Sequence, residues 1–122
     1  MLAKRNRITR GADYRATVRR GVRFSGTLTV TYVRTNVDSG AVRFGFIAGK
    51  TVGDAVRRNL VRRRLKAIAY ELLPRLADSS AGGPGVDIVV RALPASAQAG
   101  WASLHEEVSR AVSRYLSRSA TR

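Results

Sequence analysis

Residues 50–73 read KTVGDAVRRNLVRRRLKAIAYELL, and this stretch decides the fold. The spacing of Thr51 and Asp54 is typical of a first helical turn, because side-chain oxygens placed there accept the free N–H groups. Gly53 lets the chain bend sharply just before that turn. Pro74 cannot continue a helix, so the sequence predicts a helix that ends before it.

The predicted helix has one apolar side and one basic side. Projected at about 100° per residue, its apolar positions fall on a single stripe formed by Val61, Leu65, Ile68 and Leu72. The other side carries Asn59, Arg62, Arg63 and Lys66, with Arg58 at its border. Solvated helices usually interleave acids with bases to form i,i+4 pairs, whereas Arg58, Arg62 and Lys66 repel one another. A polyanion bound across this side would offset the repulsion.

The charge of the chain points to an anionic partner. Its 122 residues, the size of one domain, contain 23 Lys and Arg against 8 Asp and Glu, a net charge of +15. Such an excess of positive charge favours nucleic acid or an anionic membrane as the binding partner. No apolar run approaches the roughly 18 residues of a spanning helix, and MLAKRNRITR at the N-terminus lacks the apolar segment of a secretory signal. We therefore expect nucleic acid and no membrane as partner, and a single domain over residues 1–122.

Cysteine is absent from the chain. Its absence excludes disulfides and Cys-ligated zinc, and it fits the reducing environment of the cytoplasm. We therefore expect a cytoplasmic protein.

The segments before the basic helix predict an arm, a short helix and two strands. Residues 1–10 form a basic arm that is either a frayed, solvated terminus or a phosphate-binding extension. Residues 11–20 suit a short helix with Thr9 as N-cap. Residues 24–35 and 41–49 alternate with period two, as strands do, and the short link between them predicts an antiparallel hairpin.

The segments after the basic helix complete an α+β domain. Residues 86–93 are apolar enough to lie centrally in a sheet. Between Ser96 and Arg118, apolar spacing that begins at Trp101 and continues through Leu104 marks an amphipathic helix. The order is therefore α-β-β-α-β-α, and we predict a two-layer α-β sandwich with helices packed on one small sheet.

The residue types offer binding and no catalysis of their own. A metal-dependent nuclease needs clustered carboxylates, whereas the acids here are scattered, at positions 13, 38, 54, 71, 78, 87, 106 and 107. A histidine-based nuclease needs a second His or a Lys beside its His in a cleft, and His105 is the only histidine. Arg and Lys instead neutralise phosphates, and exposed rings stack on bases.

The basic helix also carries a family signature. Residues 50–66, KTVGDAVRRNLVRRRLK, resemble the signature of the bacterial ribonuclease P protein component: a Lys, a Gly-x-A-V turn into a helix, then Arg-Asn and a basic pair. The likeness extends over most of the chain. KRNRI at 4–8 is similar to the family's basic arm, residues 13–21 to its first helix, and RALP at 91–94 to the end of its third strand.

The resemblance implies a function and a fold. The family's protein is the RNA-binding subunit of a ribonucleoprotein whose RNA subunit carries the chemistry, with Mg²⁺ acting through that RNA and no cofactor held by the protein. The holoenzyme is an endoribonuclease that produces the mature 5′ end of tRNA, and the protein binds the single-stranded 5′ leader of precursor tRNA. No obligate protein partner is expected. The family's fold has a left-handed βαβ crossover, against the usual hand.

The resemblance also implies three groups of binding residues. The catalytic RNA would contact the basic helix and its approach through Lys50, Arg58, Asn59, Arg62, Arg63 and Lys66. The arm would contact phosphates through Arg5 and Arg7. The leader would lie in a cleft between the first helix and the sheet, against Tyr14, Val18 and Tyr32.

The sequence departs from the family pattern at three positions. Leu60 stands where the family often has Arg, which puts one RNA contact in question. Val18 stands where an aromatic residue is usual. Tyr32 shares a strand face with Leu28 and Val30. If that face packs in the core, Tyr32 is buried and does not contact the leader, and the alternation leaves both orientations open.

Two other functions share the charge and the size. One is a structural binder of ribosomal RNA, and the RNA that copurifies with the protein would separate it from a ribonuclease P subunit. The other is a sequence-specific DNA binder that uses residues 54–73 as a recognition helix. Such helices mix Asn, Gln, Ser and Arg for base edges, whereas this face is nearly all Arg and Lys.

Overall fold

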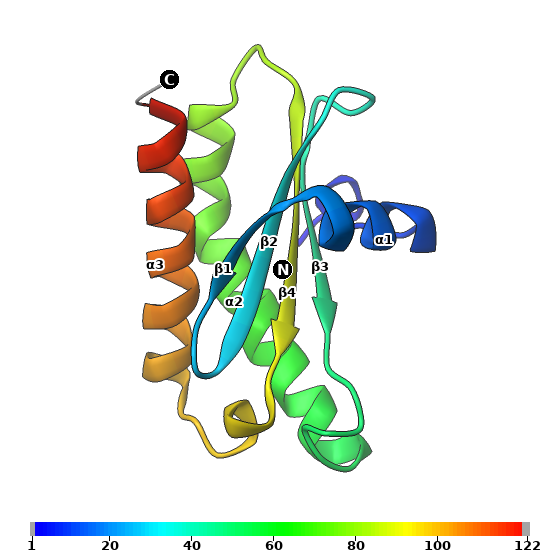
Figure 1. Ribbon diagram of the computed structural model, residues 1–122, viewed down its shortest axis with the longest axis vertical. Coiled ribbons are helices and arrows are strands. Elements are labelled where there is room, and N and C mark those ends of the chain that lie inside the picture. The colour runs from blue at the N-terminus through cyan, green and yellow to red at the C-terminus, as the bar shows by residue number, and fades with distance from the viewer. Residues whose placement is uncertain (1, 121–122) are drawn as a thin grey trace.

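The computed structural model describes residues 2–120, with side chains for residues 2–118. Four strands form one sheet, and three α-helices and two short 3₁₀ helices surround it (Figure 1). In chain order the elements are η1 (Lys4–Asn6), α1 (Gly11–Arg20), β1 (Val22–Ser25), β2 (Thr29–Asn36), β3 (Val42–Ile47), α2 (Ala55–Ser79), β4 (Gly85–Ala92), η2 (Pro94–Ala97) and α3 (Trp101–Ala120). None of the helices in this range is both long and apolar enough to cross a membrane.

The sheet has the strand order β1-β2-β4-β3. β1 and β4 each pair with β2 in antiparallel fashion, and β3 pairs with β4 in parallel. Figure 1 shows β3 and β4 running downwards, β4 to the left of β3 and α2 behind the sheet, so the β3–α2–β4 crossover is left-handed. The predicted α+β class and the unusual hand of the crossover are confirmed.

Two predictions about the strands are wrong. Residues 24–35 form two strands, because a turn whose Gly26 N–H donates to the Thr29 carbonyl separates β1 from β2. β2 and β3 do not form a hairpin, because β4 lies between them. Ile88, Val89 and Val90 of β4 are fully buried from both faces of the sheet, and a strand apolar on both faces takes the central position.

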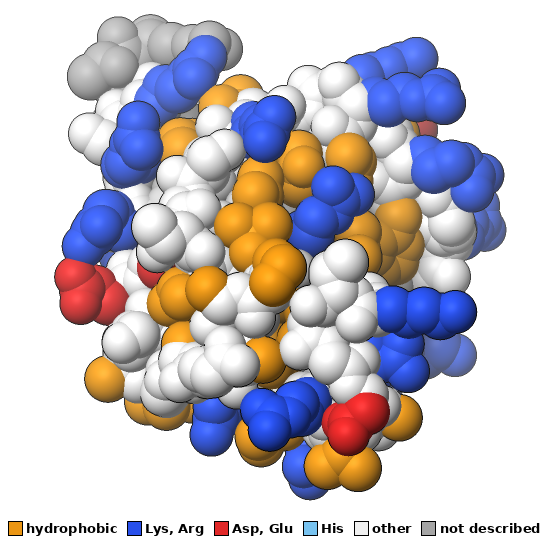
Figure 2. Space-filling view, turned by 60° about the horizontal axis from the view of Figure 1, so that its bottom comes forward, with side chains coloured by type: hydrophobic (Ala, Val, Ile, Leu, Met, Phe, Trp, Pro, Cys, Tyr) orange, Lys and Arg blue, Asp and Glu red, His pale blue; other side chains and the backbone are white. Residues whose placement is uncertain are grey.

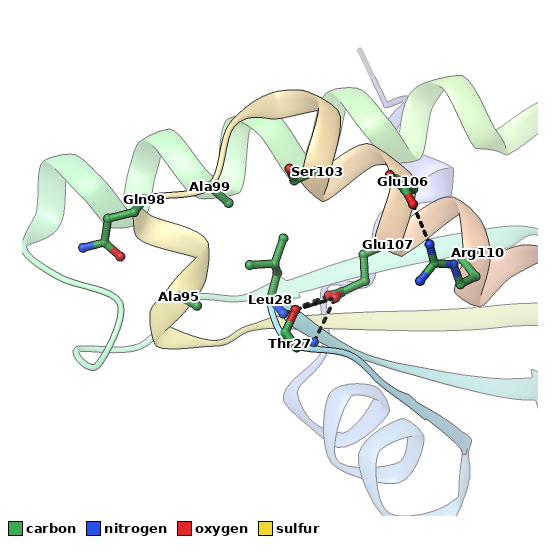
Figure 3. A pocket seen from close by; sticks show the side chains of 9 residues that line it. All are labelled: Thr27, Leu28, Ala95, Gln98, Ala99, Ser103, Glu106, Glu107 and Arg110. Atoms are coloured by element: carbon green, nitrogen blue, oxygen red, sulfur yellow. Dashed lines mark hydrogen bonds and ion pairs between the residues drawn. The ribbon is translucent and has the colours of Figure 1, made fainter.

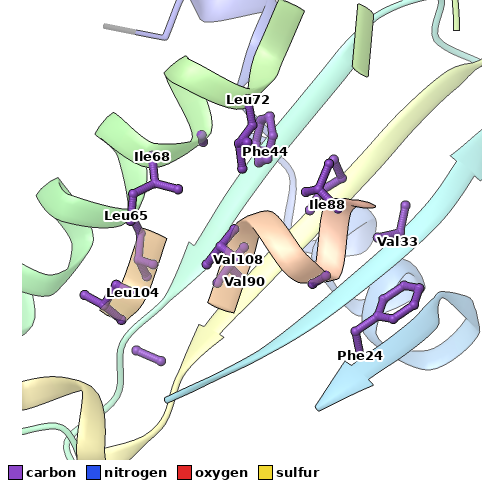
Figure 4. Close-up of a cluster of buried hydrophobic side chains, with 14 of the residues drawn as sticks. Phe24, Val33, Phe44, Leu65, Ile68, Leu72, Ile88, Val90, Leu104 and Val108 are labelled. Atoms are coloured by element: carbon purple, nitrogen blue, oxygen red, sulfur yellow. The ribbon is translucent and has the colours of Figure 1, made fainter. Parts of the chain in front are cut away.

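α2 and α3 cover one face of the sheet and enclose the main core (Figure 4). The predicted apolar stripe of α2 is confirmed, since Val61, Leu65, Ile68 and Leu72 are all buried. They meet alternate residues of the strands and the inner side of α3, including Phe44, Ile88, Val90, Leu104 and Val108. The buried stripe of α3 begins one turn later than predicted, because Trp101 is exposed whereas Leu104 is buried.

Both ends of α2 differ from the prediction: Asp54 alone supplies the side-chain cap at its start, and the helix does not end before Pro74. Asp54 is the N-cap and accepts a hydrogen bond from the Arg57 N–H at 2.9 Å, while Gly53 before it has φ of +148°, which favours glycine. The helix continues through Pro74 to Ser79. Pro74 deprives only the Tyr70 carbonyl of its partner, and both residues are exposed, so water can replace the lost bond. Burial of Leu72 and Leu76 on either side of Pro74 holds the helix together.

The opposite face of the sheet carries α1, and the N-terminal arm runs along the edge strand β3. α1 has the predicted bounds, but its N-cap is Arg10, without a side-chain bond, and not Thr9. The arm is not frayed over the described residues. Leu2 is buried in the main core, the Asn6 amide donates to the Val42 carbonyl at 2.9 Å, and the Ile8 N–H donates to the Phe44 carbonyl at 2.8 Å.

A carboxylate on α3 fixes the turn between β1 and β2 (Figure 3). Glu107 accepts hydrogen bonds from the Thr27 N–H at 2.9 Å, from the Leu28 N–H at 3.1 Å and from the Thr29 hydroxyl. This contact explains why the predicted single strand is divided: the backbone N–H groups of residues 27 and 28 bond to a helix and not to a neighbouring strand.

Glu107→Ala should therefore lower the free energy of unfolding by about 1–3 kcal/mol, because the turn loses a charged acceptor shared by several donors. Glu106→Ala is the matched control. Glu106 is exposed and pairs only with Arg110 on its own helix, so its loss should change stability by less than about 0.5 kcal/mol. Urea denaturation of both variants measures the difference, and equal effects would contradict the role given to Glu107.

Candidate nucleic-acid interface

The basic side of α2 points away from the core. Arg63, Lys66 and Asn59 are exposed, and Arg58 and Arg62 are half-buried, all on the side opposite the buried stripe. Lys50 is exposed in the loop that leads from β3 to α2. The structure thus brings the six residues expected to contact the catalytic RNA to one helix and its approach. Leu60 is half-buried between the two sides and adds no cation.

These cations have no acidic partners in the described part of the chain. None of the ion pairs among those residues involves Lys50, Arg58, Arg62, Arg63 or Lys66. Arg62 donates instead to the Asn59 side-chain oxygen at 2.8 Å and to the Ala48 carbonyl at 3.3 Å. Both acceptors are neutral, so the guanidinium is positioned while its charge remains available.

Asp87 and Asp13 lie away from α2 and serve the fold. Asp87, fully buried on β4, accepts two hydrogen bonds at 2.8 Å from Arg43 of β3 and one at 2.9 Å from Arg34 of β2. Asp13 of α1 lies 3.4 Å from Arg43 and 3.6 Å from Arg34. The hydrogen bonds from Arg43 to Asp87 raise the pKa of that guanidinium, with a smaller contribution from Asp13. The network neutralises cations on the sheet and leaves those of α2 untouched.

The arm places Arg7 near α2. Arg5 and Arg7 are exposed, and Arg7 forms a bridge with Phe44 at the edge of the sheet. Arg7 also lines one groove together with Arg63 and Lys66. The structure therefore joins part of the predicted phosphate-binding arm to the predicted RNA-binding helix.

The three residues expected to contact the leader meet on the other face of the sheet. Tyr14, Val18 and Tyr32 belong to one apolar cluster beneath α1, in which Tyr14 packs its ring against Gly45 of β3. Tyr32 is only 6% exposed, so it supports this surface from below and offers little area for contact. The face of β2 that carries Tyr32 packs against α1 and lies on the side of the sheet away from the main core. Tyr14 and Val18 are half-buried and reach the surface.

Sequence reasoning missed the residues that continue this surface beyond α1. Ile47 and Leu93 are half-buried members of the same cluster, and the Arg91 guanidinium lies 5.7 Å from the centre of the Tyr32 ring. Their position follows from the register, in which Arg91 is opposite Val30 and beside Ile47. Figure 2 shows hydrophobic side chains gathered in the middle of one face of the molecule, with Lys and Arg on both sides and few acids.

A sequence model of the ribonuclease P family, described as Ribonuclease P, matches residues 2–116. The chain belongs to the ribonuclease P protein family. Family membership implies a role in tRNA 5′ processing as part of ribonuclease P. The ribonuclease P protein component of Clavibacter michiganensis is 48% identical over 114 residues, which cover 93% of this chain and 96% of the relative. That of Pseudarthrobacter chlorophenolicus is 44% identical over 122 residues, covering 100% of this chain and 85% of the relative.

Solved structures of the ribonuclease P family share the fold at low sequence identity. The RNase P protein of Staphylococcus aureus matches with a TM-score of 0.73 and 19% identity, over 90% of this chain and 94% of that one. The RNase P protein of Thermotoga maritima matches with a TM-score of 0.69 and 20% identity, over 88% of this chain and 96% of that one. The fold found here is therefore that of ribonuclease P proteins.

The packing of Tyr14 on Gly45 can be tested by adding one methyl group. A Cβ at residue 45 would lie 2.5 Å from the Tyr14 ring, so Gly45→Ala should displace α1 and lower the free energy of unfolding by about 1–3 kcal/mol. Gly49→Ala is the matched control, since a Cβ there meets nothing within 4 Å and should be nearly neutral. Thermal or urea unfolding of both variants measures the effect, and a neutral Gly45→Ala would show that α1 is not seated on β3 as described.

Proposed function

We propose that this chain is the RNA-binding subunit of ribonuclease P, that the basic side of α2 binds the catalytic RNA, and that the apolar surface beside α1 binds the 5′ leader of precursor tRNA. The observation that carries the proposal is the cationic side of α2, whose charges have no acidic partner among the described residues. Arg side chains with free guanidinium groups form paired hydrogen bonds to phosphates.

The second surface suits a single strand and not a duplex. Tyr14 and Val18 of α1, with Ile47 of β3 and Leu93 just after β4, offer apolar area at the surface, and Arg91 adds one cation among them. Unpaired bases stack on or pack against such side chains, while paired bases keep their faces hidden. We therefore assign this surface to the unpaired leader and the helix α2 to the folded catalytic RNA.

Metal chemistry belongs to the RNA subunit in this proposal. In the described part of the chain, His, Asp and Glu never gather in a group of three or more that could hold an ion. The carboxylates instead cap α2, hold the β1–β2 turn and neutralise Arg34 and Arg43. This donor set does not fit a protein-held ion, so Mg²⁺ would act through phosphates of the RNA. The protein would lower the Mg²⁺ requirement by supplying positive charge.

Removal of two cations from α2 tests the first surface. Arg58→Ala combined with Arg62→Ala should weaken binding to the cognate ribonuclease P RNA by about tenfold or more, because two phosphate contacts and their counterion release are lost. In the reconstituted holoenzyme at low Mg²⁺, wild-type protein should stimulate cleavage of precursor tRNA, and the double variant should stimulate it less.

The matched control is Arg110→Ala combined with Arg114→Ala. These two residues of α3 also stand one turn apart, and their substitution removes the same charge. However, Arg110 pairs with Glu106, and the Arg114 guanidinium lies over the Phe24 ring of β1. The control should bind nearly as wild type does. Equal losses of RNA affinity in both double variants would show that only the net charge of the protein matters. That result would contradict the assignment of α2 as the RNA-binding surface. Recovery of ribosomal RNA fragments with the purified protein, in place of one catalytic RNA, would contradict the whole proposal.

Substitution of Arg91 tests the second surface. Arg91→Ala should lower the affinity of the holoenzyme for precursor tRNA by roughly threefold to tenfold, because a cation beside the unpaired leader is lost. Affinity for mature tRNA, which has no leader, should not change. The ratio of the two dissociation constants measures the leader contribution alone, because it cancels any effect on assembly with the RNA subunit. An unchanged ratio would remove Arg91 from the leader surface.

A further inference from the structure

Two exposed aromatic rings stand beside the basic side of α2. Tyr70 is 51% exposed and Trp101 is 39% exposed, although large rings are usually buried. The other large hydrophobic residues left exposed in the described chain are Val37 and Val56, which are aliphatic and lie elsewhere. Both rings line the same groove, which has a volume of about 650 Å³. Exposed rings gathered in one concave site indicate a binding surface.

The groove is built by three segments that are distant in sequence. α2 contributes residues 63, 66, 67, 70 and 71, a spacing that puts them on one side of the helix. Ala67, with its small side chain, and buried Leu2 of the arm also line the groove. Arg64 donates to the Ala99 carbonyl at 2.9 Å and so ties the segment before α3 to α2. This bond positions Trp101 beside the α2 residues.

The charge of the groove is positive. Arg7, Arg63 and Lys66 line it, and Glu71 is its only acid among the described residues. The Glu71 carboxylate lies 3.3 Å from the Nε2 atom of His105 on α3. An occupant must therefore present an aromatic or apolar part to the two rings and a negative part to the three cations.

We propose that this groove binds an unpaired nucleotide of the RNA subunit, with its base packed against both the Tyr70 and the Trp101 rings and its phosphates in contact with Arg7, Arg63 and Lys66. This inference rests on the proposed function and adds to it a base-binding site next to the phosphate-binding side of α2. A nucleotide combines a flat apolar ring with an anion a few ångströms away, which matches both halves of the groove. An apolar protein segment would satisfy the rings and leave the cations unpaired.

Trp101 offers a direct measurement, because it is the only tryptophan in the chain. Titration of the wild-type protein with cognate ribonuclease P RNA should quench its fluorescence, since a stacked base quenches indole emission. The quenching should saturate with the dissociation constant found by filter binding. Unchanged Trp101 emission at saturating RNA would overturn the inference. Emission that changes with protein concentration in the absence of RNA would assign the groove to a second copy of the chain and also overturn it.

A pair of substitutions at Tyr70 separates stacking from packing. Tyr70→Leu keeps an apolar side chain with high helix propensity but removes the ring, and it should weaken RNA binding by about tenfold. Tyr70→Phe keeps the ring and should bind nearly as wild type does. Val37→Ala, at the exposed tip between β2 and β3, is the control for removal of an exposed hydrophobic side chain. A Tyr70→Leu variant that binds with wild-type affinity would overturn the inference.

Different binding results would contradict the base-binding groove and the proposed function. If wild-type protein does not bind ribonuclease P RNA, both are wrong. If wild-type protein binds, and the Arg58→Ala and Arg62→Ala variant binds more weakly, the proposed function holds. Under those conditions, wild-type affinity in Tyr70→Leu shows that the RNA contacts the cations of α2 without a base in the groove.

Discussion

The packing of the α2 stripe against the sheet and α3 determines where the positive charge of this molecule points. Each buried Leu, Ile or Val on that stripe contributes about 1.5–3 kcal/mol relative to exposure. Repulsion between like charges one turn apart on an exposed helix costs only about 0.2–0.5 kcal/mol per pair. The hydrophobic term is several times larger, so the helix keeps its orientation even though Arg58, Arg62 and Lys66 are held near one another.

The distribution of the few acids completes the asymmetry. Asp87 is fully buried on β4 and binds Arg34 of β2 and Arg43 of β3, the strands on either side, while Asp13 approaches the same arginines from α1. Glu107 holds a turn, Asp54 caps α2, and Glu106 pairs along α3. A carboxylate bound to several donors inside the protein cannot also neutralise the outer side of α2. The fold and the binding surface therefore depend on the same separation of charges.

The sequence could predict the features that depend on local periodicity. The stripe of α2, the bounds of α1 and the central place of β4 follow from apolar spacing within one segment. Features that depend on partners distant in sequence could not be predicted. The insertion of β4 between β2 and β3, the turn held by Glu107, and the passage of α2 through Pro74 each require a contact with another element. The burial of Tyr32 beneath α1 and the exposure of Trp101 are of the same kind.

The residues of the candidate site could likewise be predicted only where they lie on one segment. The basic side of α2 can be found from charge and spacing alone, and its residues lie together as expected. Arg91 and Ile47 were missed because only the register of β4 against β3 places them beside one another, and Leu93 was missed because it joins the same cluster only through packing. Tyr70 and Trp101 were missed because they stand on different helices, and either ring alone fits an amphipathic pattern. A cluster of exposed rings can be identified only in three dimensions.

The salt dependence of binding to the cognate ribonuclease P RNA tests the central claim most directly, because it counts the phosphates that the free cations neutralise. With about six contacts, the affinity of the wild-type protein should fall by roughly a thousandfold between 50 and 200 mM monovalent salt, linearly on a double-logarithmic plot. A decrease of less than about tenfold over that range would show that few phosphates are bound, and would contradict the account of α2 as an unpaired cationic surface for RNA.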